Sequence, residues 1–278
     1  MIGTEIKPDA RVILNMPRAE YDALPGMNYS VLKHGLRSMA HLRAAVMSQM
    51  PRKDTDTLRI GQALHLLVLE PELAKTGIAV APKINRRTND GKAEWSAFLA
   101  ASAGKIVLDP DDYATALGMA ESVRADPVAG PLFRGVGNPE AVVAWTDRAT
   151  GVRCKSRLDW LGESGIADLK SCQSAHPDDA ARDVSKWGYD LQASFNVSGV
   201  MEARGGEWTF TWVFVENTPP FVCAAYPCSQ RTLAVGKAQF TTLLHRYRAC
   251  ADSGVWPGYG ERELEVSEWE ARSWGVQE

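Results

Sequence analysis

Charged and apolar residues alternate from Gly151 to Cys172, and this stretch carries the side chains that point most directly to chemistry. A period of two indicates strands, and Glu163-Ser164 between two glycines indicates a two-residue hairpin turn. Counting from that turn places Asp159 opposite Asp168, with Lys170 two residues further along the second strand. The spacing therefore predicts two facing carboxylates with a cation beside them.

Side chains on the first strand of this hairpin point to alternating faces. One predicted face is charged and the other is mostly apolar. The charged face consists of Arg153, Lys155, Arg157 and Asp159, and the opposite face consists of Cys154, Ser156, Leu158 and Trp160.

A third strand is predicted over Ala141–Asp147. If its last residue pairs with Val152, the same counting places Glu140 opposite Asp159. Glu140, Asp159 and Asp168 would then form a row across three strands, where like charges repel unless a cation lies between them. Oxygen ligands favour a hard ion, so the row predicts Mg²⁺ or Mn²⁺. The alternative is an ordinary solvated polar face, which a register slip of one residue would produce.

Composition excludes several classes of protein. The chain has 278 residues and a net charge of −3, which is typical of a soluble globular protein and not of a uniformly basic nucleic-acid-binding protein. Its five cysteines include no Cys-x-x-Cys pair, which argues against a zinc or iron–sulfur site. No apolar run could span a membrane and no signal-peptide pattern is present, so we expect a cytoplasmic protein without a membrane partner.

Before the three predicted strands, the chain is expected to be mainly helical. After them, we expect a helix, two strands and a final helix. Residues 1–27 are expected to be irregular. Expected helices cover about 28–49, 55–70, 92–103, 109–126, 187–203 and 230–252, and further strands cover 105–108, 207–216 and 221–227. This order predicts an α/β fold with a mixed central sheet flanked by helices. We expect one domain over residues 1–278, divided into a mainly helical N-terminal part (1–135), an α/β core (136–252) and a C-terminal tail (253–278).

His65 lies four residues after Gly61 on a predicted helix, so the two share a face. A histidine on an apolar helix is usually a hydrogen-bonded core residue. Glycine lowers helix stability, however, which indicates that another group approaches its backbone closely. Together these residues make His65 a candidate ligand.

Two polar segments have both an ordinary and a functional interpretation. The loop at residues 82–92 is the densest positive segment, and Arg86 and Arg87 within it would belong to a surface loop or contact phosphates. Tyr189 and Gln192 lie on one face of a later helix, either as a polar surface or as a hydrogen-bonding edge aimed at the site. The tail is apolar enough to dock on the body or on another subunit, through Trp256, Trp269 and Trp274.

Together these residues resemble a known nuclease superfamily. Asp159 followed by Asp168-Leu169-Lys170 resembles the D-(D/E)xK signature of the PD-(D/E)xK nucleases. Upstream, Gly61-Gln-Ala-Leu-His65 resembles the histidine motif of RecB-like nucleases, and Tyr189-Asp-Leu-Gln192 resembles their Tyr/Gln motif. Three further segments are similar to RecE-like nucleases (the exonuclease VIII C-terminal domain) of phages and prophages: Tyr21–Pro25, Arg86–Thr88 and Gly151–Lys155.

The resemblance implies a role for each matching residue. The metal, Mg²⁺ or Mn²⁺, would be held by His65, Asp159, Asp168 and the backbone carbonyl of Leu169, with Glu140 as a further acid. Lys170 would position or activate the attacking water. Gln192 and Tyr189 would orient the substrate strand or the groups around the metal. Contacts to DNA phosphates would come from Arg86, Arg87, Lys155 and Arg157.

The resemblance also implies a function: Mg²⁺-dependent 5′-to-3′ digestion of linear double-stranded DNA, leaving 3′ single-stranded tails for recombination. It implies a homo-oligomer, which could be a ring, and a single-strand annealing recombinase as partner. One competing hypothesis is a structure-specific endonuclease of the same superfamily, which should cut closed circles. The other is a non-catalytic DNA-binding or scaffold protein, against which the intact Asp159, Asp168 and Lys170 argue.

Overall fold

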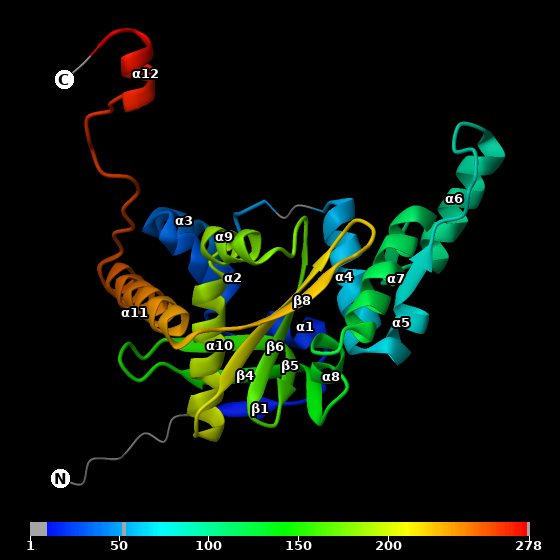
Figure 1. Cartoon of the computed structure of the whole chain (residues 1–278), viewed down its shortest axis with the longest axis horizontal. Coiled ribbons are helices and arrows are strands. Elements are labelled where there is room, and N and C mark those ends of the chain that lie inside the picture. The colour runs from blue at the N-terminus through cyan, green and yellow to red at the C-terminus, as the bar shows by residue number, and fades with distance from the viewer. Residues whose placement is uncertain (1–9, 52–53, 277–278) are drawn as a thin grey trace.

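The computed structural model describes residues 10–51 and 54–276, and its centre is a six-stranded sheet (Figure 1). The strand order is β1-β4-β5-β6-β7-β8, and only β6 and β7 pair in parallel, so the sheet is mixed. The strands are β1 (Arg11–Ile13), β4 (Gly137–Thr146), β5 (Arg153–Gly162), β6 (Gly165–Cys172), β7 (Thr209–Glu216) and β8 (Cys223–Pro227). The predicted fold class is confirmed.

Helices cover both faces of this sheet, because successive residues of its strands enter two different cores. On β7, Phe210, Trp212 and Phe214 belong to one core, and Val213 and Val215 belong to the other. The first core is completed by α2 (Tyr29–Leu32), α3 (Met39–Val46), α10 (Tyr189–Arg204) and α11 (Gln230–Ser253). The second is completed by α4 (Asp56–Leu69), α7 (Pro110–Ala125) and α8 (Ala129–Leu132).

The hairpin of β5 and β6 forms with the predicted register. Trp160 pairs with Ala167 and Leu161 pairs with Ile166, around the turn at Glu163-Ser164. The backbone N–H of Asp147 donates to the carbonyl of Val152 at 2.9 Å, so the β4–β5 register is also the predicted one. The three strands that carry Glu140, Asp159 and Asp168 are therefore paired in the registers predicted from the two turns.

The N-terminal region differs from the prediction in two ways. Residues 10–27 are not irregular throughout, because β1 joins the edge of the central sheet and α1 covers Arg18–Ala23. The helix predicted over 28–49 is broken into α2, the 3₁₀ helix η1 (Lys33–Leu36) and α3. Asn28 caps the first piece, and the Ser38 hydroxyl accepts from the His41 N–H and caps a new helix. Residues 1–9 lie outside the described residues.

A projecting unit follows α4. It contains α5 (Pro71–Gly77), the parallel pair β2 (Ile78–Val80) and β3 (Ile106–Leu108), and α6 (Asn89–Ala101), which extends from the body in Figure 1. At the other end of the chain, α9 (Pro177–Trp187) precedes α10, and α12 (Glu268–Ser273) lies beyond α11. Among the helices of the described residues, none is long and apolar enough to cross a bilayer.

Candidate active site

The site lies where β5 and β6 separate. Their ladder ends at Trp160 and Ala167, so Asp159 and Asp168 occupy the first facing positions beyond it. Instead of strand pairing, the Asp159 Oδ2 accepts from the Leu169 backbone N–H at 2.8 Å. The separation leaves room between two strands for side chains from other elements.

Glu140 marks a matching interruption between β4 and β5. Pro139 pairs with Trp160 and Ala141 pairs with Leu158, but the intervening pair is missing, and Glu140 has a positive φ of 51°. Its carboxylate accepts from Arg157 Nε. The alternation of side chains along β5 is also interrupted here. Leu158 packs in the first core and Trp160 in the second, so the prediction that these two side chains share one face of the strand is wrong. The irregular backbone orients Glu140 toward the site.

His65 reaches the same place from α4. Its Nδ1 lies 3.5 Å from Asp159 Oδ1, and its Nε2 lies 3.0 Å from the Leu169 carbonyl oxygen. Thr55 caps this helix and Leu64, Leu67 and Val68 anchor it in the second core, as the apolar spacing predicts. The histidine is therefore held against the two central strands, β5 and β6, by the helix packing and by its contacts with Asp159 and Leu169.

Three of these side chains form a group that fits a divalent cation. One ligand atom each from His65, Glu140 and Asp159 lies within 4.8 Å of the others. One imidazole nitrogen and two carboxylates suit Mg²⁺ or Mn²⁺, since a hard ion prefers oxygen ligands and also accepts imidazole. The Leu169 carbonyl oxygen lies beside this group, 3.0 Å from His65 Nε2.

Electrostatics in this group also favour a cation. Burial raises the pKa of Glu140, and the neighbouring charge of Asp159 raises it further. Burial opposes ionisation of Asp159 too, but the charge and hydrogen bond of His65 lower its pKa below the usual value. Burial works against protonation of His65, yet Asp159 raises the pKa of this histidine to about 9. The two acids repel each other and a positive partner relieves that repulsion.

Asp168 belongs to a different set of contacts. Its carboxylate forms an ion pair with Lys170 and accepts from Gln192 Nε2 at 2.8 Å. The Lys170 ammonium lies 4.7 Å from the centre of the Tyr189 ring. Burial raises the pKa of Asp168 to about 6, with a further contribution from Asp159. The predicted acid row is thus divided, since Glu140 joins the group of His65 and Asp159 whereas Asp168 faces Lys170.

A cavity of about 900 Å³ opens beside these residues. It contains Glu140, Arg157 and Lys170 from the sheet and Tyr189 from α10. Sequence analysis missed several other wall residues, chiefly Arg18, Gln62, Ser171, Asp183, Lys186 and Trp187. Arg18 follows Pro17 at the start of α1, and a proline before a helix-compatible run could have identified this short helix.

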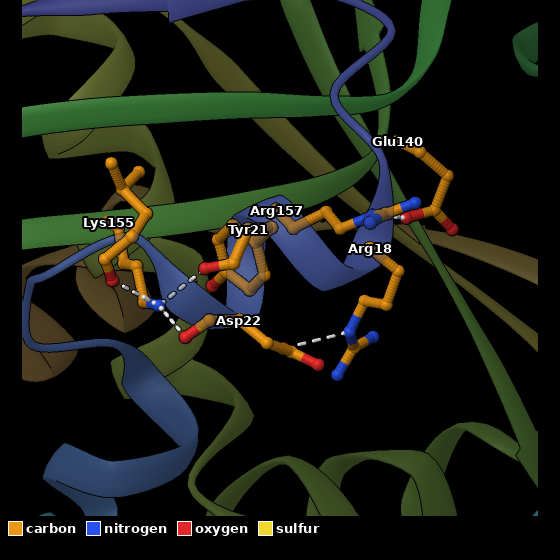
Figure 2. A network of polar contacts seen from close by, with 7 residues as sticks. Arg18, Tyr21, Asp22, Glu140, Lys155 and Arg157 are labelled. Carbon is orange, nitrogen blue, oxygen red and sulfur yellow. Dashed lines mark hydrogen bonds and ion pairs between the residues drawn. The ribbon is translucent and has the colours of Figure 1, made fainter.

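Lys155 does not reach this cavity, which corrects the predicted phosphate contact. It is 4% exposed, and its ammonium donates to the carbonyls of Tyr21, Asp22 and Leu24 at 2.6, 3.3 and 2.7 Å. Figure 2 shows Lys155 beside the end of α1, with its ammonium directed toward Tyr21 and Asp22, whereas Arg157 reaches toward Glu140. A buried ammonium bound to three carbonyls closes the C-terminus of α1 and is unavailable to DNA.

Arg86 and Arg87 lie outside the main cavity. Arg86 stacks on Trp95 of α6, with its guanidinium carbon 3.5 Å from the ring centre, and lies 3.8 Å from Asp109. Arg86 lines a second cavity of about 750 Å³, and this cavity shares Gln62 with the first. Arg87 is exposed. The structure therefore places the basic loop beside the candidate site but not within it.

Gly61 was predicted to have another group packed closely against its backbone, and the structure does not show such a contact among the described residues. A Cβ added to it would meet Ser171 Oγ at 3.6 Å, which is an ordinary contact. Gly61 lines the cavity beside His65, four residues away on α4. Its main effect is to leave space in the wall, not to admit a neighbouring backbone.

Comparison with known proteins agrees with this geometry. Residues 28–266 match the family described as a PDDEXK-like domain of unknown function (DUF3799). The crystal structure of a candidate exonuclease from Eubacterium rectale is similar in fold, with a TM-score of 0.61 and 11% sequence identity over 95% of this chain and 100% of that one. No curated protein matches the sequence. The chain belongs to the PDDEXK-like DUF3799 family, within the PD-(D/E)xK nuclease superfamily.

Proposed function

We propose that this nuclease-like protein is a RecE-like 5′-to-3′ exodeoxyribonuclease that degrades linear double-stranded DNA and leaves 3′ single-stranded tails for recombination. The observation that supports this most is the convergence of His65, Glu140 and Asp159 beside the Asp168–Lys170 pair. The sequence motifs and the fold shared with a candidate exonuclease support the same function.

Mg²⁺ or Mn²⁺, when bound, supplies Lewis-acid polarisation of the scissile phosphate. His65, Glu140 and Asp159 hold the ion in this proposal, with the Leu169 carbonyl beside them. Lys170 orients the attacking water and offsets the negative charge that develops on the phosphate. Asp168 keeps the Lys170 ammonium in place through their ion pair.

Gln192 and Tyr189 support that pair from α10. The Gln192 amide fixes one oxygen of Asp168 at 2.8 Å, which leaves the other oxygen for Lys170. The Tyr189 ring provides a face for the ammonium at 4.7 Å. These contacts limit the positions that Lys170 can adopt, and we assign Gln192 and Tyr189 a positioning role.

Cations in the cavity wall match a phosphodiester backbone. Arg18, Arg157 and Lys186 line it from three different elements. Arg157 lines the cavity, and its buried Nη1 has no hydrogen-bond partner among the described residues, so this guanidinium keeps a donor that its own chain does not use. The substrate proposed for this wall is an end of duplex DNA.

Three parts of the proposal rest on the resemblance alone. They are a homo-oligomer that remains on the DNA, a single-strand annealing recombinase that takes over the 3′ tail, and 5′-to-3′ polarity. The cytoplasm is the compartment in which these steps would occur.

Linear duplex DNA labelled at either the 5′ or the 3′ end tests the proposal. With Mg²⁺ or Mn²⁺, the wild-type protein should release nucleotides progressively from 5′ ends, and chelator or Asp159→Asn should abolish release. The ions should also raise the melting temperature of the wild type but not of Asp159→Asn, because a ligand that binds the folded state stabilises it. Cleavage of closed circles would favour the endonuclease hypothesis over the exonuclease hypothesis. Absence of any cleavage with either ion would refute both hypotheses.

A further inference from the structure

The C-terminal arm, defined here as Glu261–Trp274, buries almost none of its side chains against the described part of its own chain. Leu264, Trp269 and Trp274 are 87%, 79% and 83% exposed, and α12 within the arm has no buried residue. Isolated helices shorter than about 12 residues are marginal in water, so a six-residue helix needs a surface to pack against. Exposed tryptophans on such a segment indicate that this surface belongs to another molecule.

The chain before the arm is firmly attached to the body. The Ala40 N–H donates to the Pro257 carbonyl at 3.0 Å, and Arg37 Nε donates to the Tyr259 hydroxyl at 2.6 Å. Trp256 packs against Tyr247 of α11, with ring centres 5.7 Å apart. The arm that follows leads away from the body in Figure 1, where α12 lies apart from the other helices. It is therefore presented outward from a fixed point.

A groove of matching chemistry lies between α9 and α11, over β7 and β8, and encloses about 440 Å³. Its apolar wall consists of Ala180, Val184, Phe214, Tyr226 and Val235. Val235 is 47% exposed although it lines this wall. The groove is thus an apolar surface that residues 10–51 and 54–276 leave uncovered.

Two polar features of the groove call for a partner with acceptors and negative charge. Trp212 is 4% exposed, and its indole N–H has no hydrogen-bond partner among the described residues. Arg231 lines the groove at the start of α11. The acid in the wall, Asp190, is already engaged, because it accepts from Gln239 Nε2 at 3.0 Å and from the Leu191 N–H at 2.8 Å.

The arm supplies what this groove lacks. It contains five glutamates and two arginines, whereas α11, one wall of the groove, contains four lysines and arginines and one aspartate, so the arm and this wall have opposite net charge. The other wall, α9, contains three aspartates and two basic residues. Trp269 lies between Glu268 and Glu270, which combines an apolar ring with carboxylate acceptors. We propose that the C-terminal arm of one copy docks in the α9–α11 groove of a second copy of this chain, with an arm tryptophan against the apolar wall.

This exchange does not depend on the nuclease activity, so it is tested by assembly alone. Sedimentation of the wild-type protein at micromolar concentration should show a concentration-dependent oligomer that weakens with salt, because opposite charges meet at the interface. Trp269→Ser with Trp274→Ser should raise the dissociation constant at least tenfold, as expected when buried tryptophans are truncated at an interface.

Two valines provide a matched control. Val235→Glu in the groove should weaken assembly as strongly as the arm variants, whereas Val222→Glu should not, because Val222 is equally exposed at 47% but does not line the groove. Val235→Glu and Val222→Glu should both retain the wild-type circular dichroism spectrum. A monomeric wild type, or an oligomer that both sets of variants leave unchanged, would overturn the proposal.

The identity of the second molecule is tested by photo-cross-linking. A photoreactive phenylalanine analogue at position 269 in unlabelled chains, mixed with isotopically heavy chains, should give light–heavy peptide pairs that contain α9 or α11. Pairs that are light–light only would mean that the arm folds onto its own groove. No cross-link to the groove in either form would assign the arm to a different protein.

Discussion

Two lysines on neighbouring strands, the buried Lys155 on β5 and the half-buried Lys170 on β6, have opposite surroundings. Lys155 is 4% exposed and donates to three backbone carbonyls beneath α1 (Figure 2). Lys170 is paired with Asp168 and lines the large cavity. Burial lowers the pKa of Lys155, whereas at Lys170 the charges of Asp168 and Asp159 outweigh burial and raise the pKa.

The difference shows that a buried cation identifies a reaction site only together with its partners. Backbone carbonyls saturate the donors of Lys155 and fix a helix end, which is a structural task. The carboxylate beside Lys170 leaves its ammonium at a surface that substrate can reach. Lys155 therefore stabilises the wall of the site, whereas Lys170 lines its cavity.

Lys170→Met should have the largest effect on cleavage. We expect a loss of about 10²–10³-fold or more, because a preorganised donor to developing charge is removed. Stability should fall by less than the roughly 3–5 kcal/mol typical of a broken buried ion pair. Burial and Asp159 already raise the pKa of Asp168 to about 6, so this carboxyl can take up a proton. Single-turnover cleavage and filter binding would measure both effects, and parallel loss of binding would contradict the role in chemistry.

Lys155→Met should have the opposite effect to Lys170→Met, with a large loss of stability and little loss of cleavage. Loss of a charged donor to three carbonyls should lower the free energy of unfolding by roughly 2–4 kcal/mol, while cleavage per folded molecule stays near wild type. Hydrogen exchange should accelerate most in α1, whose C-terminal carbonyls lose their partner. Arg153→Met is the matched control, since Arg153 begins the same strand but is exposed. A cleavage loss as deep as that of Lys170→Met would remove the distinction between the two lysines.

Local sequence rules predicted the strands that carry both lysines. The turn at Glu163-Ser164 set the β5–β6 register, and the strand alternation placed Lys155 on the same face as Arg157. What alternation could not predict is that α1 covers one end of that face and leaves the other open. The position of α1 depends on contacts distant in sequence, such as the Lys155 N–H with the Met27 carbonyl at 2.8 Å.

The acid row shows the same limit. Pairing arithmetic placed Glu140, Asp159 and Asp168 at neighbouring positions, and the structure confirms that order. Which two acids share a ligand group depends on the positive φ of Glu140 and on the packing of α4, which brings in His65. Neither follows from strand periodicity. The division between a metal group and a lysine pair therefore required the three-dimensional structure.

Gln192→Met should have an intermediate effect. It removes the amide that holds one Asp168 oxygen at 2.8 Å but preserves side-chain volume. We expect cleavage to fall about tenfold through misplacement of Asp168 and Lys170, as is typical for groups that orient an active-site shell. Asn196→Ala is the control: Asn196 lies on the same helix face, one turn further, and accepts from Ser156 at 2.8 Å. That control should lower stability without lowering the rate constant for cleavage.

The smallest expected effects come from the two arginines of the basic loop, which extend the comparison to cations at the surface. Arg87 is exposed, so Arg87→Gln should weaken DNA binding and reduce its salt dependence by about 0.9 in the slope of log K against log salt for one lost phosphate contact. Arg86 is already engaged by Trp95 and Asp109, so Arg86→Gln should change the slope less. Binding isotherms over a range of salt concentrations would measure both slopes. Equal slopes for wild type and Arg87→Gln would make the loop an ordinary surface segment, while a larger change for Arg86 would mean that its stack on Trp95 opens to receive the DNA.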